Sequence, residues 1–153
     1  MSPGAGGPAA AMHQALAAAR RGVLAGEPPV GACIVHDGDV LVVAHTGVVA
    51  GPDATAHAEI LALRDACRQL RTTRLAGCEL YVTVEPCAMC LTAAHYAGIT
   101  RIHFGAPLGS LARITGSELR GVVPAGLTLS GGLLVDECEA LLREWAATRV
   151  PHG

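Results

Sequence analysis

The chain is organised around two short stretches, TAHAE at residues 55–59 and EPCAMC at residues 85–90. They contain one imidazole, from His57, and two thiols, from Cys87 and Cys90, which are ligand types that zinc prefers in proteins. Three protein ligands leave the fourth tetrahedral position open, as in catalytic zinc sites and in contrast to closed structural ones. The sequence therefore predicts one Zn²⁺ per chain, bound by these three side chains.

Glu59 supplies a fourth polar group, two residues after His57, where it can face a zinc-bound water without being a ligand. Zinc lowers the pKa of such a water from 15.7 to about 7, so that a hydroxide forms near neutral pH. We expect this hydroxide to attack an amino-bearing ring carbon. Glu59 would take the water proton, deliver it to the ring nitrogen, and then protonate the leaving amine in a second transfer. The predicted reaction is hydrolytic deamination with release of ammonia, and Glu59 is its predicted catalytic residue.

A Cys-x-x-Cys pair on its own has other interpretations, because it also occurs as half of a structural zinc site or as a redox-active dithiol. Here Pro86 precedes the pair, and the His57-x-Glu59 motif lies one predicted helix and one predicted strand upstream. This combination favours a catalytic site over both alternatives.

The composition indicates one globular domain. With 153 residues the chain has the length of a single domain, predicted over 1–153 with a mobile start at 1–8. Its net charge is −2 and all 11 basic residues are arginines, so no broad positive surface is indicated for nucleic acid. No run is long enough to span a bilayer, and the N-terminus lacks the order of a signal peptide. We expect a cytoplasmic protein without membrane contact, whose four cysteines outside the motif are buried free thiols.

The hydrophobic pattern predicts an α/β fold. Helices are predicted over 8–25, 57–70, 87–97, 110–119 and 133–147, and strands over 30–36, 40–44, 79–84, 101–105 and 127–130. This order indicates one mixed sheet with helices on both faces, in which strands connected through helices run parallel.

Both motifs fall at predicted helix starts. Cys87 and Cys90 are three residues apart in a first turn, so their side chains share one face, and the positive end of the helix dipole favours their thiolate form. His57 begins its own predicted helix. We expect both helix starts to meet at the carboxyl edge of the sheet, where α/β proteins bind ligands.

Three segments, HAEILAL at 57–63, LYVTVEPCAMC at 80–90 and RIHFG at 101–105, resemble the cytidine deaminase-like superfamily. Within it the chain is most similar to the branch that contains guanine deaminases and bacterial tRNA adenosine deaminases. The resemblance implies a three-layer αβα sandwich around a five-stranded mixed sheet, with the same roles for the zinc ligands and the catalytic glutamate. It also implies backbone contacts to the substrate from Ala58 and the Glu85–Pro86 step, and a homodimer formed through helices next to the site.

The chain departs from these relatives at positions that would decide the substrate. Thr46 stands at the end of the second predicted strand, where the relatives carry an asparagine that binds the base, and a hydroxyl lacks the donor and acceptor pair of an amide. Its neighbour His45 and Tyr96 on the third predicted helix are further candidate substrate contacts. The resemblance to guanine deaminases implies that the segment 114–120 and the C-terminal residues close over the site, from the same chain or from a partner subunit.

The leading hypothesis is a zinc-dependent deaminase of a small amino-heterocycle, such as guanine, cytosine, a nucleoside or an analogue. A nucleic acid substrate is disfavoured but left open, because the tail 143–153 holds only two arginines and few aromatic side chains are available to stack on bases. One alternative is a tRNA-specific adenosine deaminase that acts on an anticodon loop. An alternative of another class is a non-catalytic zinc-binding module, against which the intact Glu59 argues.

Overall fold

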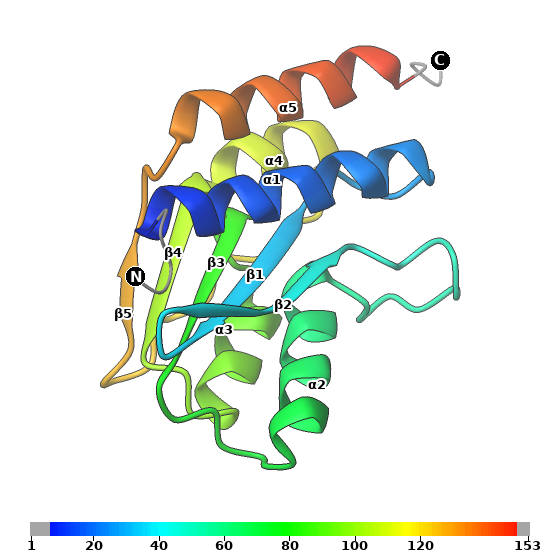
Figure 1. The fold of residues 1–153 in the computed structure, drawn as a ribbon. Coiled ribbons are helices and arrows are strands. Elements are labelled where there is room, and N and C mark those ends of the chain that lie inside the picture. The colour runs from blue at the N-terminus through cyan, green and yellow to red at the C-terminus, as the bar shows by residue number, and fades with distance from the viewer. Residues whose placement is uncertain (1–6, 150–153) are drawn as a thin grey trace.

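A five-stranded sheet forms the centre of the structure, a computed structural model that describes residues 7–149 (Figure 1). The strands are β1 (Gly31–His36), β2 (Asp39–His45), β3 (Cys78–Val84), β4 (Arg101–Ala106) and β5 (Thr128–Ser130), and the helices are α1 (Gly7–Leu24), α2 (Ala58–Leu70), α3 (Ala88–Tyr96), α4 (Leu108–Thr115) and α5 (Val135–Thr148). The order in the sheet is β2-β1-β3-β4-β5. β1 is antiparallel to β2 and β3, whereas β3, β4 and β5 are parallel neighbours. β2 and β3, which α2 connects, therefore run in the same direction, and the predicted mixed sheet is confirmed.

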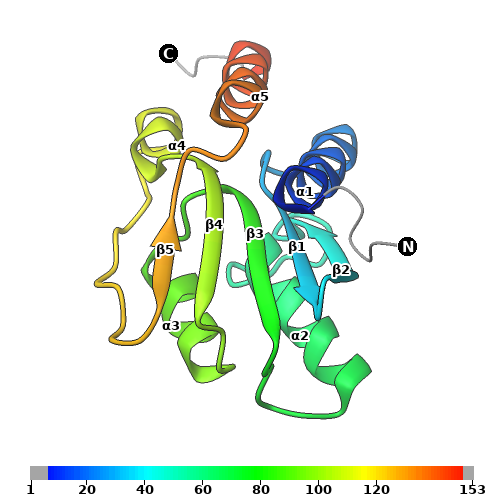
Figure 2. The ribbon, with the colours of Figure 1, turned by 60° about the vertical axis from the view of Figure 1, so that its left-hand side comes forward.

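Helices cover both faces of the sheet, so the predicted three-layer αβα sandwich is also confirmed. α1 and α5 lie over one face, and α2 and α3 lie over the other (Figure 2). α1 can approach β1 closely because Gly31 has no side chain, since a Cβ there would lie 1.9 Å from the carbonyl oxygen of Ala15. The neighbouring β1 residues Ala32, Cys33 and Ile34 are fully buried, as expected for a strand covered on both sides.

Most boundaries fall within two residues of the prediction, and the exceptions have local causes. α1 begins at Gly7, one residue before the predicted helix start at Pro8, so the last two residues of the expected mobile start are helical; the missing N–H of proline is tolerated in this first turn. The rest of that predicted start, residues 1–6, lies outside the described residues. The helix predicted over 110–119 is instead α4, which stops at Thr115 because Gly116 takes the left-handed conformation of a C-cap, with φ of 70°. None of the helices within residues 7–149 is long and apolar enough to cross a membrane.

One edge of the sheet carries the candidate site. The parallel strands β3 and β4 end together there, with Val84 opposite Ala106. α3 begins shortly beyond β3, and α2 begins after a loop, residues 46–57, that follows β2. Both motifs of the sequence therefore lie at the carboxyl edge of the sheet, as expected.

Candidate active site

Three metal-ligating atoms meet at the starts of α2 and α3. The Nδ1 atom of His57 lies 3.6 Å from the Sγ atom of Cys87 and 3.5 Å from that of Cys90, and all three atoms lie within 4.8 Å of one another. With Zn–N of about 2.0–2.1 Å and Zn–S of about 2.3 Å, tetrahedral geometry separates a nitrogen and a sulfur ligand by about 3.6 Å. The three side chains therefore fit a zinc ion in the positions that they already occupy.

The backbone at both helix starts leaves these side chains free for a metal. His57 and Cys87, which we predicted as the first residues of their helices, are instead the N-cap residues of α2 and α3, and both have extended backbone conformations. Neither side chain caps its own helix. Cys90 lies in the first turn of α3, on the same side as Cys87. The positive dipole ends of both helices consequently point to the same place.

Hydrogen bonds within this cluster shift the pKa values of the two cysteines in opposite directions. The hydrogen bond between the two thiol groups lowers the pKa of Cys87 to about 4, with a smaller contribution from the imidazole of His57. The same bond, together with burial, raises the pKa of Cys90. The bond to Cys87 also raises the pKa of His57. The protein itself therefore stabilises the thiolate form of Cys87, which is the form that binds zinc.

Glu59 lies beside the cluster on the first turn of α2. Its side chain is almost completely buried, at 3% exposure, and burial raises the pKa of its carboxyl group to about 7. A carboxyl group with a pKa near neutrality can both accept and give up a proton. It also lines a cavity at this edge of the sheet, as the predicted catalytic role requires.

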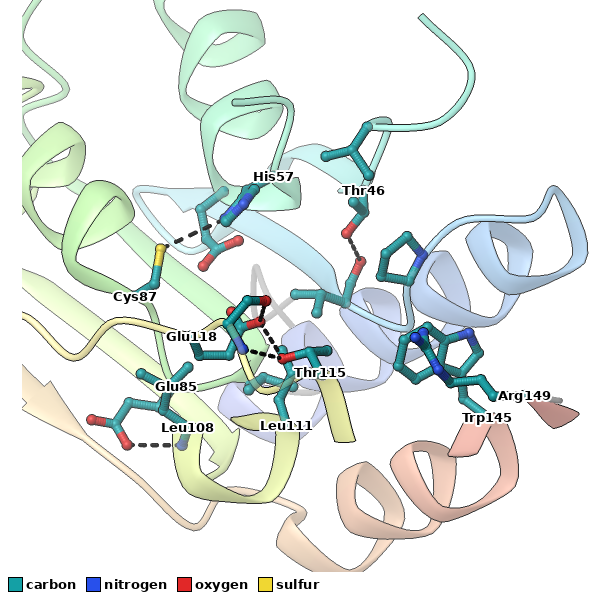
Figure 3. A pocket seen from close by; sticks show the side chains of 16 residues that line it. Thr46, His57, Glu85, Cys87, Leu108, Leu111, Thr115, Glu118, Trp145 and Arg149 are labelled. Atoms are coloured by element: carbon teal, nitrogen blue, oxygen red, sulfur yellow. Dashed lines mark hydrogen bonds between the residues drawn. The ribbon is translucent and has the colours of Figure 1, made fainter. Parts of the chain in front are cut away.

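This cavity has a volume of about 310 Å³ and extends from the metal-ligating residues to the end of α5. His57 and Cys87 lie at one end, and Trp145 and Arg149 lie on the opposite side (Figure 3). One wall is formed by the linker between α1 and β1 together with the loop after β2, through Pro28, Val30, Thr46 and Val48. The facing wall is formed by α4 and the segment after it, through Leu108, Leu111, Thr115, Ser117 and Glu118.

Two of the predicted substrate contacts reach this cavity, but both also have partners within the protein. Thr46 is buried, and its hydroxyl donates to the carbonyl oxygen of Val30 over 3.3 Å. Glu85 accepts a hydrogen bond from the backbone N–H of Leu108, at 3.0 Å, and another from the guanidinium of Arg120. The Glu85 side chain therefore holds α4 and the following segment in place.

The other three predicted contacts do not line the cavity within the described residues. His45 precedes Thr46 in an extended chain, so the two side chains point to opposite sides, and the ring of His45 lies against Gly22 of α1. Ala58 is fully buried. Tyr96 is 76% exposed and lies at the far end of α3, next to a separate surface hollow that it shares with His95 and Arg74.

Sequence reasoning missed Glu118, Trp145 and Arg149 as individual residues. The expected closing segment 114–120 does reach the cavity, and it does so from the same chain. Glu118 is anchored there by a hydrogen bond from the hydroxyl of Thr115, at 2.7 Å. Trp145 falls in the helix predicted over 133–147, but the sequence pattern could not show that this residue faces a cavity. The Arg149 guanidinium stacks over the Trp145 ring, 4.4 Å from its centre.

Comparison with known proteins identifies related chains. Residues 8–106 match the family described as the cytidine and deoxycytidylate deaminase zinc-binding region. The tRNA-specific adenosine deaminase of Aquifex aeolicus is 50% identical over 92 residues, which cover 60% of this chain and 61% of that protein. The match therefore spans about three fifths of that relative's length.

Solved structures agree with this relationship. The guanine deaminase from Nitrosomonas europaea superposes with a TM-score of 0.82 at 31% identity and covers 92% of this chain and 85% of its own. A structure from a study of A-to-I editing by tRNA:A34 deaminases has a TM-score of 0.71 at 32% identity and covers 86% of this chain and 98% of its own.

Proposed function

The chain belongs to the zinc-binding family of cytidine and deoxycytidylate deaminases, and we propose that it is a zinc-dependent hydrolytic deaminase of a small amino-substituted heterocycle. One observation carries the proposal. The buried carboxyl group of Glu59 lines a cavity whose end is formed by two of the metal-ligating residues, His57 and Cys87. A metal site and a proton carrier therefore face the same enclosed space.

The proposed zinc ligands are His57, Cys87 and Cys90, with one ion per chain. Their spacing and the acidity of Cys87 support this assignment. When bound, the ion would supply a Lewis acid that lowers the pKa of a water molecule to about 7.

Glu59 would move the protons of the reaction. Its carboxylate accepts a proton from the attacking water and delivers it to the ring nitrogen next to the amino-bearing carbon. It then takes the second proton from the hydroxyl group that has been added to the ring carbon and gives it to the amine, so that the C–N bond breaks and ammonia leaves as the C=O bond forms. Water and the amino-heterocycle are thereby converted to a carbonyl product and ammonia. Proton transfer by a positioned side chain contributes roughly 10²–10⁴-fold to such a rate.

The dimensions of the cavity support a small substrate. Its volume of about 310 Å³ is at the lower end of the range of about 300–1,000 Å³ for small-molecule sites. Val30 and Leu111 supply apolar walls for a flat ring, and Glu118 supplies a carboxylate that can accept N–H groups of the ring. A nucleobase such as guanine or cytosine, or its nucleoside, contains a flat ring with N–H groups that matches these walls and this carboxylate.

A second candidate is the deamination of adenosine in the anticodon loop of a tRNA. The 50% identity with the Aquifex aeolicus tRNA-specific adenosine deaminase favours it. Such a substrate needs an extruded base to enter the cavity and a surface for the flanking nucleotides. The net charge of −2 offers only local positive groups for that surface, so we place the small molecule first. A non-catalytic zinc-binding module would not need a buried glutamate at the cavity.

A substrate panel tests these candidates directly. The zinc-loaded protein is incubated with guanine, cytosine, adenosine, cytidine and an anticodon stem-loop that contains adenosine, and ammonia is measured. Ammonia from a free base or nucleoside supports the leading proposal. Ammonia from the stem-loop alone supports the second, and ammonia from no substrate supports the non-catalytic module.

Assembly and compartment also belong to this proposal. We infer a homodimer. Exposed apolar side chains support it, because Leu119 is 72% and Val122 is 91% exposed next to the start of α3.

We infer a reducing, cytoplasmic compartment, which the six unpaired cysteine thiols support.

A further inference from the structure

Glu27 is a buried acidic residue in the linker between α1 and β1. Its side chain is 1% exposed, and burial of a charged carboxylate is costly unless hydrogen bonds replace the lost water. Within residues 7–149, no arginine or histidine side chain lies within ion-pair distance of it. Its partners must therefore come from the backbone.

Those partners are two successive N–H groups of the loop that follows β2. The N–H of Val49 donates to both carboxylate oxygens of Glu27, at 3.0 and 3.2 Å, and the N–H of Ala50 donates to Oε2 at 2.8 Å. Hydrogen bonds to a charged acceptor are about twice as strong as neutral ones. Glu27 thus joins its own linker to a loop that lies 22 residues further along the chain.

The two joined segments form one wall of the cavity. Pro28 and Val30 come from the linker, and Thr46 and Val48 come from the loop. Without Glu27 the two segments would still meet at Thr46, whose backbone N–H donates to the carbonyl oxygen of Val30 at 3.2 Å. Beyond Thr46 the loop bonds mainly to itself, as between the N–H of Asp53 and the carbonyl oxygen of Val48, at 3.1 Å.

We propose that Glu27 is a positioning residue that sets the substrate-facing wall of the cavity, an inference that rests on the proposed deaminase function. Glu27 does not line the cavity itself. It fixes the position of Val48 in the cavity wall through the amides of the two residues that follow Val48. The metal-ligating end has contacts of its own, because the carbonyl oxygen of His57 accepts the N–H of Leu61 in the first turn of α2, at 3.0 Å. Loss of Glu27 is therefore expected to weaken substrate binding while zinc remains bound.

The test compares Glu27→Ala and Glu27→Gln with the wild-type protein and with Ile102→Val. Ile102 is a fully buried core residue of β4 outside both segments, so its variant reports the effect of lower stability alone. Zinc content, melting temperature, kcat and KM are measured on the substrate that the wild-type protein deaminates. For Glu27→Ala we expect KM to rise roughly tenfold, with a smaller change in kcat and zinc content near one per chain. Glu27→Gln keeps one acceptor oxygen and should show a smaller rise.

The outcomes separate this inference from the proposed function. If the wild-type protein deaminates a substrate but Glu27→Ala leaves KM within twofold of wild type, the inference is wrong and the function stands. An equal rise in KM for Ile102→Val at a similar loss of melting temperature also overturns the inference. If the wild-type protein deaminates nothing, the proposed function fails, and the positioning role fails with it.

Discussion

Arg120 donates a hydrogen bond to the carboxylate of Glu85, the residue directly before the proline and cysteine of the second motif. The same carboxylate accepts the backbone N–H of Leu108 at the start of α4. A second hydrogen bond joins the same two segments, since the N–H of Ala88 donates to the carbonyl oxygen of Leu119 at 2.8 Å. The segment that carries Glu118 is thereby fastened to the start of α3, next to the proposed zinc ligands.

Replacement of Arg120 by alanine should loosen this segment. Because the side chain of Arg120 is 60% exposed, we expect the unfolding free energy to fall by only about 1 kcal/mol or less. The loss of position should affect the substrate more, with a rise in KM of roughly threefold to tenfold. The matched control is Arg113→Ala, which removes an exposed arginine from α4. Equal KM values for the two variants would show that the Glu85–Arg120 pair does not position the cavity wall.

Replacement of Cys87 or Cys90 by alanine should remove the metal. We expect zinc measured by atomic spectroscopy to fall from about one ion per chain to near zero, because two remaining protein ligands hold zinc weakly. The melting temperature should fall as well, since metal binding stabilises the folded chain. Cys67→Ala removes a half-buried thiol outside the cluster and should keep its zinc. Full zinc content in both Cys87→Ala and Cys90→Ala would contradict the ligand assignment.

Glu118→Gln should lower kcat/KM. The variant keeps the shape of the side chain but replaces the carboxylate that lines the cavity beside Thr115. Loss of a hydrogen bond to a charged group costs about 1.5–3 kcal/mol, which corresponds to roughly 10- to 100-fold in kcat/KM. Glu144→Gln, on an exposed position of α5, is the control and should retain the wild-type value. A Glu118→Gln variant with unchanged kcat/KM would remove this residue from substrate recognition.

The buried thiol of Cys33 should make the protein less stable at alkaline pH. Burial in β1 raises the pKa of this thiol from 9.0 to about 11. The unfolded chain therefore loses the proton at a lower pH than the folded one, and the stabilising effect of the neutral thiol is complete below pH 9 and is lost as pH rises toward 11. We expect a loss on the order of 2 kcal/mol across this range.

Urea unfolding between pH 8 and 11 measures this effect. The unfolding free energy of Cys33→Ala should fall less steeply with pH than that of the wild-type protein. Each profile is compared with its own value at pH 8, so that the effect of the substitution on packing is removed. Burial also raises the pKa of Cys138, to about 12, so some alkaline loss should persist in the variant. Parallel profiles for the wild-type protein and Cys33→Ala would contradict the assignment to Cys33.

The metal cluster and the sheet could be predicted from the sequence because their signals are local. The spacing of His57, Cys87 and Cys90 and the alternation of helix and strand patterns are properties of short segments. The structure places neither His45 nor Tyr96 in the wall of the cavity, for equally local reasons. In an extended chain His45 and Thr46 point to opposite sides. Tyr96 comes nine residues after Cys87, which in a helix places it roughly 13 Å from the site.

The far side of the cavity could not be predicted, because it is made by tertiary packing. Trp145 and Arg149 are four residues apart and share one side of the helical chain, but the sequence does not specify what that side faces. Glu27 is a similar case, since a glutamate before two prolines is usually read as part of an exposed linker. Only the folded chain brings the loop after β2 over it.

Ammonia release by the zinc-loaded wild-type protein and by Glu59→Gln tests whether the chain is a deaminase that uses Glu59 to carry protons. Both proteins are first shown to bind about one zinc per chain and to unfold cooperatively, and each is then incubated with the best substrate of the panel. We expect steady release by the wild-type protein and a decrease of roughly 10²–10⁴-fold in kcat for Glu59→Gln, because the variant cannot carry the proton. An equal rate of ammonia release by the two zinc-loaded proteins would contradict the account.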